Sequence, residues 1–334
     1  MTALTMSLMR TVTIRKLAST LAAAGVTLSA ATPAFAAGDA VEVPRQPWSF
    51  AGFFGRYDAA QLQRGYQVYQ EVCSNCHGIK RVYFRNLAEA GGPGFPEDRL
   101  KSLVAAKFKV DDAPNDQGKV LKRAALLSDA IPAPFKNDKE ARSANGGSLP
   151  PDLSVITKAR SVEYIGPWYL HPFAMLRDIG SGYQEHGPDY VYALLTGYGE
   201  APLYKRDDKG HLVKLAKGAP AAGAERCASI TPGEKGKPDE CVKVANGMNY
   251  NVVFPGHQIA MPMPPFPTEK RAKYPAGVTA TVEQQARDVV AFLAWTADPS
   301  LNQRKQMGML VMIYLLITAV LLYLAKKKLW SRVH

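Results

Sequence analysis

The sequence contains few cysteines, four in 334 residues. Cys73 and Cys76 share one short motif, whereas Cys227 and Cys241 lie in a polar stretch with 13 residues between them. Zinc is one interpretation of such residues, but no second pair of ligands lies at the spacing of a zinc finger. The composition, 47% hydrophobic and 21% charged, also lacks the bias of collagen-like, coiled-coil or disordered chains.

Acidic residues are missing from both ends of the chain. Three basic residues lie before residue 37, and four lie after residue 325. Of the net charge of +12, only +5 therefore belongs to the 289 residues between these ends. This distribution is typical of membrane-topology signals rather than of a surface that binds nucleic acid. We therefore predict no nucleic-acid partner.

Residues 1–36 have the pattern of a cleaved secretory signal peptide. Three basic residues within positions 10–16 precede an apolar run of small residues, and Ala34-Phe35-Ala36 offers a cleavage site. The mature chain is then expected to begin at Ala37. A short core helix is the alternative, and the basic flank and the cleavage pattern disfavour it.

Residues 307–325 carry no charge over 19 positions. At about 1.5 Å per residue, a helix of this length spans roughly 28 Å, close to the hydrocarbon thickness of a bilayer. The heavier basic cluster, Lys326–Lys328, follows the run and belongs on the cytoplasmic side. We therefore predict a transmembrane anchor over 304–326, a cytoplasmic tail over 327–334 and an extracytoplasmic domain over 37–303.

Export places the cysteines in an oxidising compartment, where disulfides persist. Cys227 and Cys241 lie close together in the sequence and belong to no metal-binding pattern. We therefore predict a disulfide between Cys227 and Cys241 that closes this polar loop.

The segment Cys73-Ser74-Asn75-Cys76-His77 has the form C-x-x-C-H. Two thiols at this spacing can add to the two vinyl groups of one haem, and the adjacent histidine can bind the iron. A thioredoxin-like C-x-x-C motif is the alternative, but it requires a βαβ unit that the surrounding sequence does not indicate. The motif therefore predicts one covalently attached haem c (heme c), with Cys73 and Cys76 as its attachments and His77 as an axial ligand.

Hydrophobic periodicity predicts two helices that would pack around this haem. Apolar residues repeat at helical spacing over 59–73, and Asp58 with Gln61 resembles a capping box at the start. A second amphipathic helix begins after Thr281, with Gln284 as the capping partner. Together the two helices form the basis of a small haem-packing bundle.

The sixth iron ligand decides what such a protein can do. An open position binds gas or peroxide, whereas a thioether ligand favours electron transfer at a raised potential. Met261 and Met263 lie in a proline-rich segment that the prolines hold extended and stiff. A single methionine is ordinarily core filler. From the residues alone, the two methionines are nearly equal candidates.

Several blocks of sequence carry patterns that are more specific than the haem motif. They are Trp48-Ser49-Phe50, residues 65–77, residues 145–154 with Ala159-Arg160, residues 189–192 with 194–198, and residues 254–261 with the prolines that follow. In these blocks the chain resembles the cytochrome c1 family, the haem c subunits of the cytochrome bc1 complex. The resemblance implies a mostly α fold: a class I cytochrome c-like haem domain with long loop insertions at about 161–187 and 205–245, plus one C-terminal transmembrane helix.

The resemblance also assigns roles to single residues. It selects Met261 as the second axial ligand of the iron. It places Arg160 at a haem propionate, which suits the planar fork of a guanidinium. It further implies that Tyr190 lies near the same haem edge and that Asn145 and Pro151 line the pocket.

The function implied by the resemblance is electron transfer in the respiratory bc1 complex. The chain would accept electrons from the Rieske iron–sulfur protein and pass them to a soluble or membrane-tethered cytochrome c. Its other implied partners are cytochrome b, membrane lipid and the second half of a dimeric complex. It would be a single-pass protein of the bacterial inner membrane, with the haem domain on the periplasmic side and the C-terminus in the cytoplasm.

Whether the lone chain counts as an enzyme is open at this point, although the complex would be a quinol–cytochrome c reductase. Two alternatives from other classes also stay open. One is a tethered c-type cytochrome that serves another reductase or oxidase. The other is a haem enzyme or sensor with an exchangeable sixth iron position.

Overall fold

The computed structural model describes residues 41, 43–161, 166–181, 186–216, 222–233, 237–266, 274–275 and 277–331. Residues 40–334 form one compact unit. The predicted signal peptide over residues 1–36 lies outside the described residues and stays a prediction.

The described chain is mostly helical, with short antiparallel strands. Its α-helices are α2 (Ala59–Glu71), α3 (Glu97–Lys107), α4 (Asp138–Ala144), α5 (Ile156–Ala159), α6 (His171–Ser181), α7 (Gly187–Thr196), α8 (Val282–Ala297) and α9 (Leu301–Trp330). Its 3₁₀ turns are η2 (Cys73–Asn75), η3 (Phe84–Ala88), η4 (Trp168–Leu170) and η5 (Pro255–His257). The predicted mostly α class is confirmed.

The strands form four small sheets. They are β1 (Lys109–Pro114), β2 (Val120–Ala124), β3 (Leu203–Arg206), β4 (Leu212–Lys214), β5 (Ala224–Arg226), β6 (Ser229–Thr231), β7 (Glu240–Val242), β8 (Asn249–Tyr250) and β9 (Gln258–Ile259). The sheets pair β1 with β2, β4 with β3 and β5, β6 with β7, and β8 with β9. The predicted insertion over 205–245 therefore begins within β3 and contains β4–β7, and the one over 161–187 contains η4 and α6.

Helix α2 begins where the sequence predicts but ends before the haem motif. The Asp58 side chain accepts a hydrogen bond from the Ala60 backbone N–H (3.1 Å) and so caps the first turn. The predicted helix over 59–73 is two residues too long, because α2 ends at Glu71 and the chain tightens into the turn η2 at Cys73.

A buried carboxylate, Asp288, joins α2 to α8. Helix α8 is capped by the Thr281 hydroxyl, which accepts from the Gln284 N–H (3.1 Å). The side-chain amides of Gln61 and Gln284, predicted to close capping boxes, donate instead to Asp288 (3.2 and 2.9 Å). Arg64 donates two further bonds (2.8 and 3.2 Å) to this carboxylate, which has no exposed surface. These donors offset the cost of burying the charge.

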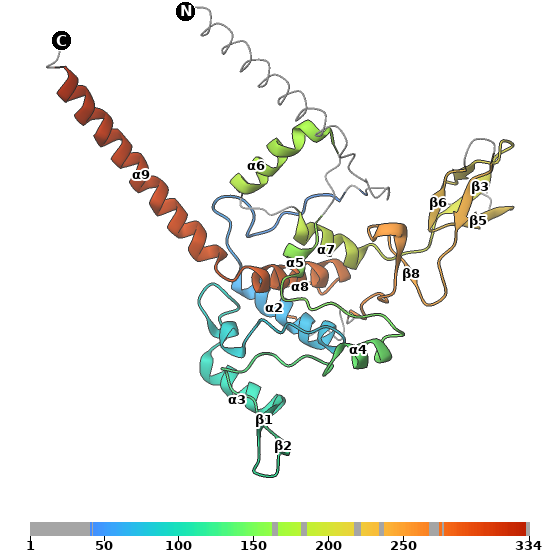
Figure 1. Cartoon of the computed structure of the whole chain (residues 1–334), viewed down its shortest axis with the longest axis horizontal. Coiled ribbons are helices and arrows are strands. Elements are labelled where there is room, and N and C mark those ends of the chain that lie inside the picture. The colour runs from blue at the N-terminus through green and yellow to red at the C-terminus, as the bar shows by residue number, and fades with distance from the viewer. Residues whose placement is uncertain are drawn as a thin grey trace, which may run out of the picture. The chain divides into compact units, whose positions relative to one another are not determined.

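Helices α2 and α8 lie side by side at the centre of the core (Figure 1). At Gly65 the two backbones approach so closely that a Cβ atom would overlap the carbonyl oxygen of Asp288 and lie 2.7 Å from the Phe292 Cβ. The rings of Tyr66 and Tyr69 then pack on Phe292, with centroids 5.6 and 5.9 Å apart. The missing side chain at Gly65 therefore permits the helix crossing that fills this core.

Replacing Gly65 with alanine is expected to destabilise the domain by about 3 kcal/mol, the upper end of the usual cost of overpacking. The added methyl meets backbone atoms of α8, which cannot swing aside as a flexible side chain would. Thermal unfolding of the purified chain in mild detergent, followed by circular dichroism, measures the effect. Gly199→Ala is the matched control, because nothing lies within 4 Å of a Cβ there. Equal midpoints for the two variants would contradict the close crossing.

The polar insertion contains the expected disulfide. Cys227 is bonded to Cys241, and their Cα atoms lie 5.3 Å apart. Cys241 is the central residue of β7 and Cys227 lies two residues before β6, so the bond ties the segment that enters this small hairpin to its second strand. The bond leaves neither sulfur available as a thiolate for zinc.

Replacing both Cys227 and Cys241 with alanine is expected to loosen this insertion without changing the haem. Opening a loop of this length costs about 3 kcal/mol in the chain-entropy model. Hydrogen exchange across residues 224–242 should accelerate, while the reduction potential of the haem stays unchanged. A shifted potential would show that the insertion supports the haem pocket, contrary to this expectation.

Helix α9 is long and apolar enough to cross a membrane. It runs from Leu301 to Trp330, so it extends beyond the predicted anchor over 304–326 at both ends. The first four residues of the predicted tail, 327–330, are still helical, and the last three lie outside the described residues. The apolar side chains of this helix are not buried against the rest of the protein.

Candidate haem site

The C-x-x-C-H motif forms one tight turn directly after α2. The backbone N–H groups of Cys76 and His77 both donate to the carbonyl oxygen of Cys73 (3.1 and 2.9 Å). Both thiols are free: Cys73 is half-buried and packs against the core, whereas Cys76 is exposed. Burial raises the pKa of the Cys73 thiol to about 12, so a neutral sulfur suits this position.

His77 is held at two points, its ring and its backbone carbonyl, and the ring contact fixes its tautomer. Its ring Nδ1 lies 2.8 Å from the carbonyl oxygen of Pro151. A carbonyl only accepts, so Nδ1 carries the hydrogen and Nε2 is left with a lone pair. Burial lowers the pKa of His77, which favours the neutral imidazole. The Tyr69 hydroxyl donates to the His77 carbonyl (3.0 Å). A histidine oriented in this way is typical of a metal ligand.

The segment around Pro151 is itself fixed to the chain that follows the motif. The backbone N–H of Leu153 donates to the Gly78 carbonyl (2.8 Å). The Asp152 carboxylate accepts from the Lys80 backbone N–H (2.9 Å). The orientation of His77 therefore depends on a segment more than 70 residues further along the chain.

The methionine segment directly follows a hairpin in which β8 and β9 pair around η5. Met261 packs against the core, whereas Met263 is 49% exposed. The Met261 carbonyl accepts from the Tyr198 hydroxyl (3.1 Å) and from the Asn249 amide (3.4 Å). The two methionines that the residues alone leave equal therefore differ in burial, and the inward one is anchored through its own backbone.

Asn251 attaches this hairpin to α7, and the sequence analysis did not single it out. It is fully buried, and its amide donates to the Leu194 carbonyl (2.8 Å). Its side-chain oxygen accepts from the N–H groups of Val253 and Phe254 (3.0 and 3.2 Å). Asparagine favours such local turns, but that tendency alone does not separate Asn251 from an ordinary solvated residue.

Three residues assigned by resemblance to the haem pocket lie on α7 and at the ends of α5 and α4. Tyr190, on α7, is half-buried against the core, and this burial raises its pKa. Arg160 is exposed at the end of α5, and its positive charge opposes this increase in the Tyr190 pKa. Asn145 ends α4, and its amide donates to the Ala141 carbonyl (2.7 Å).

Comparison with known proteins gives the context for this geometry. The sequence matches the Cytochrome C1 family over residues 48–333, nearly the whole described chain. This chain belongs to the cytochrome c1 family. Like other members, it is an electron-transfer subunit of the cytochrome bc1 complex. Membership of this family implies haem c as its cofactor.

Relatives in bacteria and mitochondria support the cytochrome c1 assignment. Cytochrome c1 of Rhodospirillum rubrum is 38% identical over 321 residues, covering 94% of this chain and 96% of that protein. The mitochondrial cytochrome c1 of Saccharomyces cerevisiae is 34% identical over 296 residues, covering 89% and 74%. A protein of Bradyrhizobium diazoefficiens named cytochrome b/c1 is 40% identical over 291 residues. The match covers 87% of this chain but only 36% of that longer protein.

The residues of this cytochrome c1 fit a covalently held haem. The motif offers two free thiols on one turn and the imidazole of His77. The backbone carbonyl of Pro151 contacts Nδ1 of this ring, so Nε2 is left for the iron. Met261 adds a thioether, and its backbone carbonyl is fixed by Tyr198 and Asn249. Two thiols, an imidazole nitrogen and a thioether are the kinds of donor that hold an electron-transfer haem.

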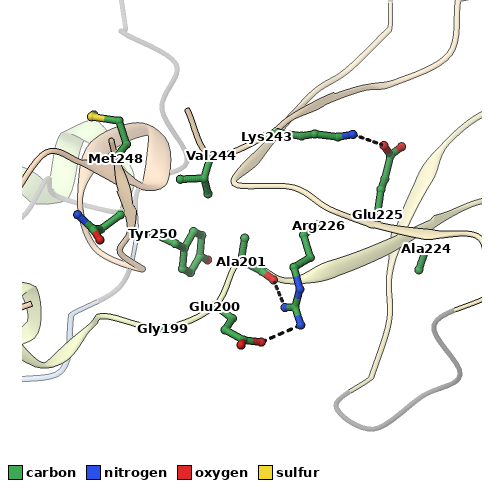
Figure 2. Close-up of a pocket in the computed structure, with 11 residues that line it drawn as sticks. Gly199, Glu200, Ala201, Ala224, Glu225, Arg226, Lys243, Val244, Met248 and Tyr250 are labelled. Atoms are coloured by element: carbon green, nitrogen blue, oxygen red, sulfur yellow. Dashed lines mark hydrogen bonds and ion pairs between the residues drawn. The ribbon is translucent and has the colours of Figure 1, made fainter. Parts of the chain in front are cut away.

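A groove beside the insertion is lined by residues 199–201, 224–226, 243–244 and 248–250, and so includes Asn249, whose amide donates to the Met261 carbonyl. Figure 2 shows its lining, in which Arg226 pairs with Glu200 (2.7 Å) and Lys243 faces Glu225 (3.9 Å). Arg226 also donates to the Ala201 carbonyl (2.9 Å). None of the predicted haem residues lines this groove, and its charges already pair with one another.

Proposed function

We propose that this chain carries one haem c through thioether bonds to Cys73 and Cys76, with His77 and Met261 as the axial ligands of the iron. When bound, the haem supplies a one-electron iron couple, so no substrate bond is broken on this chain. Arg160 and Tyr190 lie at one edge of the pocket, where a guanidinium pairs with a propionate. Asn145 and Pro151 line the pocket, Pro151 through its bond to the His77 ring.

One observation carries this proposal: His77 and Met261 are both fixed through bonds that leave their donor atoms free. The His77 ring is held through Nδ1, and Met261 is held through its backbone carbonyl. Ligands fixed in this way move little between oxidation states, which suits electron transfer. A haem enzyme or sensor with an exchangeable sixth position does not require a thioether whose backbone is fixed by two hydrogen bonds.

The proposed partners follow from the complex. The chain receives electrons from a Rieske iron–sulfur protein and passes them to a soluble or membrane-tethered cytochrome c. It packs against cytochrome b and membrane lipid in a dimeric complex, whose activity is quinol–cytochrome c reduction. After cleavage at residue 36, the haem domain over 37–303 lies on the periplasmic side of a bacterial inner membrane. Helix α9 is its single span, and the C-terminus is cytoplasmic.

A reduced-minus-oxidised optical spectrum of the chain, purified through a C-terminal tag in mild detergent, tests this function. We expect a c-type band together with b-type haem at about twice its amount. A c-type band alone would favour the free-standing tethered cytochrome. A ferrous state that binds carbon monoxide would instead indicate an open sixth position and a haem enzyme or sensor.

A further inference from the structure

Two phenylalanines project from a short turn ahead of α2. Phe53 is 50% exposed and Phe54 is 79% exposed, and their rings form a T-shaped pair with centroids 5.3 Å apart. We name residues 51–55 the diphenylalanine turn. A neighbouring pair of exposed aromatic rings is unusual on a water-facing surface, where large apolar side chains are ordinarily buried.

The turn is built so that these rings point outward. Gly52 has a φ of +75°, a left-handed conformation that favours glycine. At Gly55 a Cβ atom would overlap the carbonyl oxygen of Ala51, so only glycine fits the return of the chain. The Gly55 N–H donates to the Gly52 carbonyl (3.3 Å) and closes the turn.

The diphenylalanine turn is bound to the first turns of α9. The Lys305 ammonium donates to the carbonyl oxygens of Phe50 (2.7 Å), Gly52 (2.5 Å) and Gly55 (3.3 Å). Lys305 lies two residues before Met307, where the uncharged run begins. At about 1.5 Å per residue along a helix, the turn is attached roughly 3 Å from the start of the membrane span.

We propose that Phe53 and Phe54 insert into the apolar boundary of the lipid bilayer beside α9. The contact forms a second attachment, which fixes the orientation of the haem domain relative to the membrane. This inference rests on the proposed role of α9 as a membrane anchor. The continuity of the turn with the span, through Lys305, identifies lipid as the occupant.

The hydrogen bonds of the turn also favour lipid over a protein surface. Lipid chains offer no donors, so a backbone entering the bilayer boundary must satisfy its own carbonyls. Here Lys305 already satisfies the carbonyls of Phe50, Gly52 and Gly55, and the two phenyl rings carry no polar atoms. The turn therefore presents two apolar rings above a base in which three backbone carbonyls are already paired.

Photo-crosslinking in the intact complex tests the contact. The full chain is expressed with the photoreactive residue p-benzoylphenylalanine in place of Phe54, irradiated in native membranes and analysed by peptide mass spectrometry. We expect a phospholipid adduct on the peptide that contains position 54. Leu121, which is 50% exposed on β2, is the matched control position and should give no lipid adduct.

Carbonate extraction of the same membranes distinguishes a failure of the membrane anchoring by α9 from a failure of the lipid contact at the diphenylalanine turn. A chain released by carbonate would overturn the anchoring on which the inference rests. A retained chain whose position 54 crosslinks to another protein subunit, or to nothing, would overturn the lipid contact alone. An equal lipid adduct at position 121 would overturn it as well, because the labelling would then not be specific to the turn.

Discussion

Replacing Met261 with leucine is expected to remove the sixth iron ligand and lower the reduction potential sharply. Axial ligands control potentials over a range of roughly 0.8 V, and a methionine ligand raises the potential. Leucine has a similar volume but no donor atom, so the core contact of residue 261 is retained while the ligand is lost. Redox titration should show the fall, and carbon monoxide should now bind the ferrous protein.

Met263→Leu is the matched control for this experiment. It lies in the same proline-rich segment, but its side chain is 49% exposed. We expect its potential and spectrum to match those of the unaltered protein. If Met261→Leu left both unchanged, Met263 or a histidine would have to be the ligand, and the assignment of Met261 would be wrong.

Replacing both Cys73 and Cys76 with alanine is expected to abolish haem retention on a denaturing gel. Only covalent thioether bonds hold a haem through denaturation, and these two residues carry the free thiols among the described cysteines. A single replacement should leave one thioether and shift the band of the pyridine haemochrome. Haem staining and that spectrum measure the two effects on the same samples.

The Cys227→Ala and Cys241→Ala double variant removes the same number of cysteines and is the control for the attachment experiment. Its haem stain should equal that of the unaltered chain, because both sulfurs are already joined in a disulfide. Haem staining that survived in the Cys73 and Cys76 double variant would contradict attachment at the motif.

Local sequence signals predicted the helix starts better than the destinations of their side chains. Asp58 and Thr281 cap α2 and α8 as expected, because a cap is formed within one turn of the same helix. The partners Gln61 and Gln284 turn instead to the buried Asp288. Gln284 reaches this carboxylate four residues along its own helix, whereas for Gln61 it lies on the facing helix, which no local pattern in α2 signals.

The site shows the same division between local and distant information. The motif identified Cys73, Cys76 and His77, because their chemistry requires them at fixed spacing along the chain. The hydrogen bond from the His77 ring to the Pro151 carbonyl joins residues 74 positions apart, so no local pattern reveals it. Asn251, buried against α7, went unnoticed for the same reason.

The sequence by itself predicted the attachment motif, the export signals and the apolar span, since each depends on residues that are neighbours in the chain. It also limited the thioether ligand to a proline-rich segment, because proline fixes backbone torsion locally. Only the tertiary structure placed Met261 against the core and Met263 toward solvent. It alone brought Lys305 to the diphenylalanine turn, since the packing of α2, α8 and α9 sets distances between residues about 250 positions apart.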